Sequence, residues 1–376
     1  AYFRKVFVER LSWLTESQFA AQLALCQFLP GPASSQLGFA IAHLRGGLPC
    51  AVAAFVGFTL PSFLLMLSLA LWAQHMPPRG WVTGTIEGMK LLAAVVVLDA
   101  VINMAGQFCR SRRQQGIAVL SVVLLSLWMA PLLQLALMGL AAVLGFAWGS
   151  GAVQLSTQPL VGRRRYLLAF GALLLLALWL GSSLYAQFFV VGSMVFGGGH
   201  VVLPLLESFL GAAIDSDTFL LGYAAAQAVP GPMFSLSTYL GATAMPATPA
   251  LAALLCTLAV FLPGFLLYLG IGGMWQQLAQ QTRVMSAIAA VNAVAVGMLA
   301  AAWIDPVLSH APRQVNAVAV GMLAAAWIDP VLSHAPRQVD AVFVGILLFA
   351  LLRSGRLPII MLIAVAAGFG AWRLSL

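Results

Sequence analysis

The chain has 376 residues, of which 62% are hydrophobic and only 7% are charged, and its formal net charge is +8. Soluble domains carry about 25% charged residues, so this composition excludes a soluble globular protein and indicates an all-α protein that crosses the bilayer several times. The 18 basic residues stand singly or in short clusters between apolar runs, which fits positive cytoplasmic loops and argues against a nucleic-acid partner.

The first 73 residues predict a surface helix, a broken helix and one full span. Residues 1–16 mix aromatic and charged side chains in an amphipathic pattern, which is typical of a helix at the membrane surface. Residues 18–44 are two short apolar pieces separated by Pro-Gly-Pro. Proline lacks an N–H and clashes with the preceding turn, so the helix is predicted to break there. A span that contains a further proline follows at residues 48–73.

The middle of the chain predicts a hairpin between two clusters of arginine. Residues 86–108 form another span, and the apolar stretch 116–147 is long enough for two short spans if it turns at Pro131. A hairpin returns the chain to the side it left, so the arginine clusters on either side of it lie on one face. The positive-inside rule makes that face cytoplasmic. One extra span is predicted at 166–183.

The second half repeats the order of the first half. An apolar segment, a broken element and further spans are predicted at residues 185–200, 218–246, 250–272, 285–304, 338–352 and 357–374. The extra span would place this second repeat upside down relative to the first, as in many secondary transporters. Residues 291–314 recur letter for letter as 315–338, and we expect one copy to be displaced, with no functional role.

The two Pro-Gly-Pro sequences, 200 residues apart, are the predicted substrate site. A new half-helix can start after each break, and its first N–H groups are unpaired, carry partial positive charge and bind anions. Such matched breaks mark the site of many repeat transporters, although either copy alone would be read as a kink or loop. We therefore expect the substrate-binding residues to be Gln27, Pro30, Gly31, Pro32, Ser34, Ser35, Gln36, Arg45, Gln227, Gly231 and Ser235.

Ionisable residues in apolar stretches are costly in the bilayer and usually functional. His200 and Glu207 are expected to couple or gate transport, together with Gly197, Gly198 and Gly199. The alternative is an interfacial glutamate and a histidine bound to the backbone. Arg45 either holds a divalent oxyanion or is an ordinary positive-inside residue, and both interpretations stay open.

Three stretches resemble the chromate ion transporter family. They are Gln27 to Gln36, Leu44-Arg45-Gly46-Gly47-Leu48-Pro49 and Gly57-Phe58-Thr59-Leu60-Pro61-Ser62. Phe196 to His200 and Gln227 to Pro232 are similar to the second domain of that family. The family also has a Phe-Gly-Gly-Pro motif that would lie before Tyr2, so we expect the N-terminus to be truncated.

This resemblance implies a two-domain permease of the bacterial inner membrane that exports chromate by proton-linked antiport and confers chromate resistance. The first repeat is expected at 1–147, a linker with the extra span at 148–184 and the second repeat at 185–376. The partners implied are chromate, protons and the lipid bilayer, with sulfate and a homodimer left open.

The residues alone support only an anion transporter, and other functions of the chain have less support. A channel or transporter for another oxyanion such as sulfate is the alternative function. An enzyme is not expected, because neither G-x-S-x-G nor H-E-x-x-H occurs. The four cysteines are scattered, so no metal site or cofactor is expected either.

Overall fold

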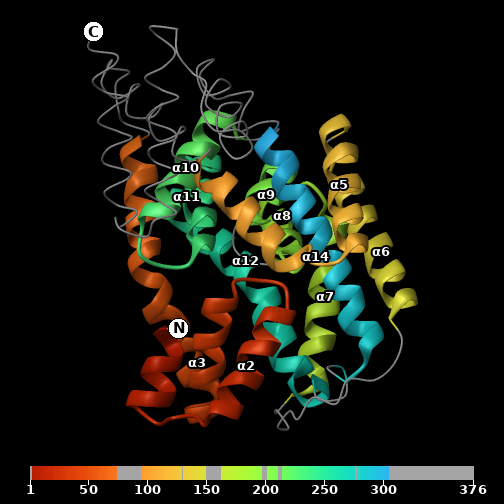
Figure 1. The fold of residues 1–376 in the computed structure, drawn as a ribbon. Coiled ribbons are helices and arrows are strands. Elements are labelled where there is room, and N and C mark those ends of the chain that lie inside the picture. Colours follow the sequence, from red (N-terminus) through yellow and green to blue (C-terminus); the bar gives the residue numbers. More distant parts are fainter. Residues whose placement is uncertain are drawn as a thin grey trace, which may run out of the picture.

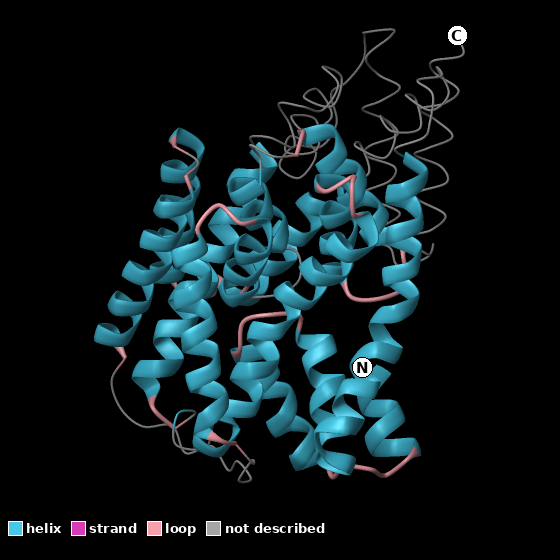
Figure 2. Ribbon diagram, turned by 180° about the vertical axis from the view of Figure 1, so that it is seen from behind, coloured by secondary structure: helices cyan, strands magenta, loops and turns pink. Residues whose placement is uncertain are grey.

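The computed structural model describes residues 2–73, 95–128, 130–149, 162–196, 201–210, 214–275, 278 and 280–304. Within these ranges the chain is helical and contains no strand, as Figures 1 and 2 show. Four apolar helices there are long enough to cross a membrane, at Ala33–Ala73, Pro131–Trp148, Pro249–Met274 and Thr282–Ala302. The prediction of an all-α polytopic membrane protein is confirmed. The predicted spans at 338–352 and 357–374 and the second tandem copy lie outside the described residues.

The N-terminal segment is shorter than the predicted surface helix. It consists of α1 (Tyr2–Arg4) and the π-helix η1 (Lys5–Arg10), and α2 begins separately at Glu16. The reason is a capping box, because the Thr15 hydroxyl accepts the Gln18 N–H while the Gln18 side chain accepts the Thr15 N–H. Thr15 has an extended backbone, so a new helix starts there.

The first broken helix folds into a hairpin. α2 (Glu16–Phe28) ends before the Pro-Gly-Pro sequence, and α3 (Ala33–Ala73) starts directly after it. α3 is bent at Gly46 and Gly47, where the backbone leaves the helical region. Figure 1 shows α2 and the first part of α3 in the lower half of the molecule, with their connecting loop at mid-height. The rest of α3 then runs back up the left edge of that view.

The second broken helix occupies the upper half of the same view. It comprises α10 (Ser216–Ala228), the short 3-10 helix η3 (Met233–Ser235) and α11 (Leu236–Ala244). α11 packs against α3 and against α12 (Pro249–Ile271), which continues into η4 (Gly272–Met274). The order of broken helix followed by a proline-containing span is therefore present in both halves, as predicted.

The remaining helices form a bundle beside these two hairpins. The predicted turn at Pro131 is confirmed, because α5 (Arg112–Leu127) and α6 (Pro131–Trp148) are separate helices. Both pack against α14 (Thr282–Ala302). A methyl group on Gly145 would lie 2.5 Å from the Ser286 carbonyl oxygen, so glycine permits this close approach.

Shorter helices connect the two halves. The helix Val95–Phe108 precedes α5, and α7 (Arg164–Leu180) covers most of residues 166–183, where an extra span is predicted. α8 (Leu184–Met194) and α9 (Val202–Leu210) follow it. α12 contacts α7 and α8, so the second proline-containing span lies at the centre of the described fold.

Candidate functional site

The first Pro-Gly-Pro loop is held by backbone and side-chain hydrogen bonds. Gly31 has a φ of 113°, which only glycine adopts readily, and its N–H donates to the Val195 carbonyl at 2.7 Å. The Gln36 side chain turns back and donates its Nε2 to the Pro30 carbonyl at 2.6 Å. Gln36 is completely buried, so it acts here as a lock on the loop. Its Oε1 atom has no partner among the described residues.

The second Pro-Gly-Pro loop is built in a similar way. Gly231 has a φ of 157°, and the Ser235 N–H donates to the Pro232 carbonyl at 2.9 Å, which forms the first turn of η3. The Ser237 hydroxyl donates to the Phe234 carbonyl at 2.6 Å. The matched glycine and the new helical turn reproduce the predicted half-helix start.

Each loop packs against a residue that follows the helix proline of the other half. A methyl group on Gly264, next to Pro263, would lie 3.0 Å from the Pro30 carbonyl oxygen. In the reverse direction, a methyl group on Gly231 would lie 2.6 Å from the Oγ of Ser62, next to Pro61. The two broken helices therefore meet through reciprocal contacts between residues about 200 positions apart in the chain.

Two serine hydroxyls at these helix starts are buried without a partner among the described residues. Ser35 in the first turn of α3 is 3% exposed, and Ser235 at the end of η3 is fully buried. Thr59, two residues before Pro61, has a hydroxyl in the same condition. Buried hydroxyls nearly always have a hydrogen-bond partner, so these groups mark a place where a ligand or water could bind. Ser34 is exposed.

The two predicted glutamines at the ends of the preceding helices differ. Gln27 is exposed and lines a cavity of about 560 Å³. Gln227 is half-buried, and its Nε2 donates to the Tyr223 hydroxyl at 3.0 Å. Gln227 is thus held within α10.

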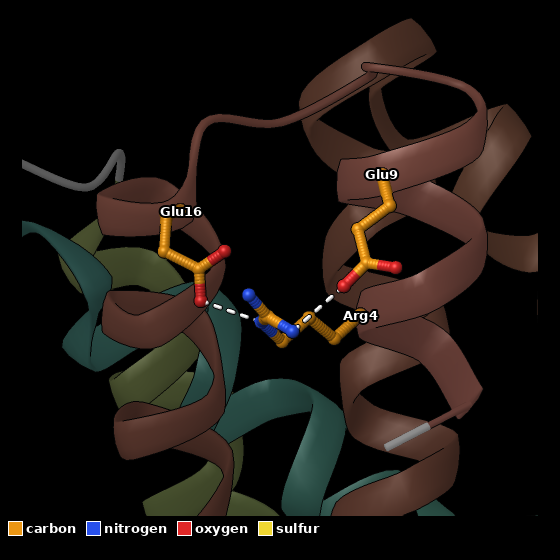
Figure 3. A network of polar contacts seen from close by, with 3 residues as sticks. All are labelled: Arg4, Glu9 and Glu16. Carbon is orange, nitrogen blue, oxygen red and sulfur yellow. Dashed lines mark hydrogen bonds and ion pairs between the residues drawn. The ribbon is translucent and has the colours of Figure 1, made fainter.

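The predicted basic residues lie away from the loops. Arg45 is exposed, and its guanidinium lies 5.5 Å from the centre of the Trp13 ring. Ten residues of helix separate it from Ser35, which corresponds to about 15 Å of rise. Arg4 bridges Glu9 and Glu16 at 2.7 Å each, as Figure 3 shows. The hydrogen bond to Glu16 and the two nearby carboxylates raise the pKa of Arg4.

The predicted coupling residues are only partly described. Gly197, Gly198, Gly199 and His200 lie outside the described residues. Glu207 is half-buried on α9.

Two buried amides were missed by sequence reasoning. The Gln134 Oε1 on α6 accepts the Ser208 hydroxyl at 2.8 Å. The Gln22 Oε1 on α2 accepts the Tyr268 hydroxyl at 2.9 Å and so joins the two halves. Gln22 and Gln134 each have apolar neighbours on both sides in the sequence. This pattern could have predicted that their amides are buried and hydrogen-bonded.

Comparisons with known proteins identify the family. A family profile described as Chromate transporter matches residues 1–146 and 182–371. An uncharacterized transporter of Methanocaldococcus jannaschii is 24% identical over 81% of this chain and 78% of its own length. A chromate transport protein of Pseudomonas aeruginosa is 25% identical over 80% of this chain and 74% of its own length. A probable chromate transport protein of Synechococcus elongatus is 26% identical over 80% of this chain and 77% of its own length. No solved structure matches. The chain therefore belongs to the chromate transporter family and is a transporter, not an enzyme.

Proposed function

We propose that this protein exports chromate from the cytoplasm across the bacterial inner membrane by proton-linked antiport and so confers chromate resistance. Family membership and the names of the relatives support chromate as the substrate. The observation that carries the proposal is the pair of buried hydroxyls of Ser35 and Ser235, which lack partners in the described part of the chain and follow matched breaks.

A tetrahedral dianion fits between two such helix starts. The first N–H groups of α3 and η3 have no partner within their own helix, and the helix dipoles place partial positive charge there. The hydroxyls of Ser35 and Ser235 add two neutral donors. A dianion bound in this way needs no permanently charged lysine or arginine at the centre, so it can leave again on the other side.

The arrangement of the two hairpins supports inverted repeats and alternating access. The first hairpin occupies the lower half of Figure 1 and the second the upper half. The first loop contacts Gly264, the residue after Pro263, and the second loop contacts Ser62, the residue after Pro61. Rocking of one repeat against the other would therefore open the central site to one side at a time.

Proton coupling is assigned to Glu207 with His200. Ionisable side chains within apolar membrane segments are costly and usually functional, and Glu207 lies in such a segment. Ser208, the next residue on α9, donates a hydrogen bond to Gln134 on α6. A change in the charge of Glu207 would therefore act next to the contact between these two helices.

Sulfate is the second candidate substrate, because chromate and sulfate share tetrahedral shape and charge. A channel is the alternative mechanism. Currents far above the turnover of a carrier, and insensitive to the proton gradient, would favour a channel over an antiporter.

The test is chromate uptake into everted membrane vesicles energised by a proton gradient, with sulfate as competitor. We expect uptake that is abolished by an uncoupler and reduced by sulfate. Replacing both Ser35 and Ser235 by alanine should lower uptake more than either single change, because both hydroxyls bind one ion.

Ser121→Ala is the matched control, because Ser121 is also buried but donates to the Ile117 carbonyl within its own helix. Full uptake by the double serine variant, or an equal loss in the control, would remove the two hydroxyls from the site.

A further inference from the structure

A cavity of about 560 Å³ runs along the length of α2, from Ser17 to Phe28. Its walls come from α2, the end of the helix Val95–Phe108, the start of α5, the residue after η4, and α14. The residues that matter are Gln27, Phe28, Arg110, Gln114, Trp275 and Asn292. The volume lies in the range of small-molecule pockets, so it has room for an ion together with several of its water molecules.

The cavity is electropositive. Among the described residues that line it, Arg110 is the only one with a charge. Glu16 is the nearest acid along α2, since it precedes the lining residue Ser17, but it is bound by Arg4 at 2.7 Å (Figure 3). Arg4 also pairs with Glu9, so it neutralises only part of this negative charge, but Glu16 itself does not line the cavity.

Two neutral groups in the wall have N–H donors to offer, while the Oδ1 of Asn292 is a buried acceptor without a donor in the described part of the chain. Gln114 has its Oε1 engaged by the Ser111 N–H at 2.9 Å, which leaves the N–H groups of its amide for another acceptor. Trp275 is 2% exposed, and its Nε1–H has no acceptor in the described part of the chain. A buried indole N–H usually finds a partner, so its lack of one points to a ligand that supplies an acceptor.

Arg110 is held in place by its neighbours. The Cys109 carbonyl accepts the Gln115 side chain at 3.1 Å, and Ser111 and Gln114 form a capping box at the start of α5. The segment that carries the guanidinium is therefore fixed at both sides. An ordered segment loses less entropy when its side chain binds an ion.

The cavity lies close in sequence to the proposed transport site. Gln27 and Phe28 form part of its wall, and the first Pro-Gly-Pro loop begins two residues later. Phe28 packs edge-on against Trp275, with ring centres 4.6 Å apart. An ion in the cavity is thus separated from the loop by the last turn of α2.

We propose that this cavity is a vestibule that binds the tetrahedral divalent oxyanion before it enters the Pro-Gly-Pro site, with Arg110 as its cation and Gln114 and Trp275 as neutral donors. The inference rests on the proposed function, because it takes the transported oxyanion as the ligand. Arg110 attracts the ion and binds it by charge-assisted hydrogen bonds, while release into the uncharged central site stays possible.

The test compares Arg110→Gln with Arg112→Gln in the vesicle uptake assay. Both changes remove one exposed arginine from the same segment, but Arg112 does not line this cavity. Arg110→Gln should raise the KM for chromate about tenfold with Vmax unchanged within about twofold, as the loss of one charge-assisted hydrogen bond predicts. Arg112→Gln should leave both constants unchanged.

Trp275→Phe is the second variant, since it keeps an aromatic ring against Phe28 but removes the N–H. It should raise KM about threefold to tenfold, as the loss of a neutral hydrogen bond predicts. Equal KM values for Arg110→Gln and Arg112→Gln would overturn the vestibule while leaving the transport proposal intact.

Equilibrium dialysis of chromate against the purified full chain separates the two proposals. If the wild type takes up no chromate, the proposed function fails, and dialysis then decides the vestibule alone. About tenfold weaker binding by Arg110→Gln than by Arg112→Gln would support it. Absence of binding, or equal binding by both variants, would overturn it.

Discussion

Replacing Gly31 by alanine tests the structure of the first Pro-Gly-Pro loop. The φ of 113° at Gly31 is a conformation that other residues adopt only with strain of about 1–3 kcal/mol. The added methyl group would also lie 2.7 Å from the Gln36 Nε2 atom, which must then move away. Its movement breaks the bond to the buried Pro30 carbonyl, at a cost of about 1–3 kcal/mol.

The expected loss of folding free energy for Gly31→Ala is therefore about 2–6 kcal/mol. Gly38→Ala is the control in the helix that follows the loop, α3, because nothing lies within 4 Å of its added methyl group. Alanine is the better helix former, so the control should be neutral or stabilising by about 0.5–1 kcal/mol. Reversible unfolding in mixed micelles measures both, and vesicle uptake measures their function.

A second change locates the cause of the loss. If the methyl group acts by displacing Gln36, then Gly31→Ala combined with Gln36→Ala should cost less than the sum of the two single changes. Equal stability of Gly31→Ala and Gly38→Ala would refute the reasoning. Strict additivity in the double variant would refute the role of Gln36 and leave only the backbone strain.

Two further predictions concern contacts between helices. Gly145→Ala should destabilise the protein by about 1–3 kcal/mol through overpacking, because its methyl group would meet the Ser286 carbonyl. Gly139→Ala on the same helix has open space around its methyl group and should not destabilise the protein. Unfolding in micelles measures both variants. Tyr268→Phe should cost about 1–3 kcal/mol, because it leaves the buried Gln22 Oε1 without its donor, and an unchanged unfolding midpoint would show that the contact between the halves contributes nothing.

The sequence predicted the local features that proline and glycine impose. The breaks at Pro30 and Pro230 and the turn at Pro131 all depend on the chemistry of a few neighbouring residues. The surface helix over 1–16 was predicted too long, because the capping box at Thr15 competes with helix continuation.

Long-range contacts were not accessible in this way. Gln36 was expected to bind the oxyanion, and nothing in the local pattern shows that its amide reaches back to Pro30. The contact of Gly31 with Val195 joins residues 164 positions apart, and only the folded chain brings them together. Arg110 was expected only as a positive-inside residue, since the other walls of its cavity come from distant segments.

The two reciprocal loop contacts are similar in position but not in chemistry. Pro61 cannot donate to the preceding turn, and the Ser62 hydroxyl instead bonds the Thr59 carbonyl at 2.9 Å, while Gly231 rests on Ser62. In the other half the residue after the proline is a glycine, Gly264, which packs against the Gln36 side chain. The two walls of the proposed site are therefore unequal.

Unequal walls have a consequence for transport. Each loop packs against a residue of the opposite half, so movement of one hairpin changes the packing around the loop of the other. The loop that contacts Gly264 is braced by the buried hydrogen bond from Gln36 to Pro30, whereas Gly231 of the other loop meets mainly the side chain of Ser62. We infer that the two hairpins move at different cost, which would favour one resting orientation of the transporter.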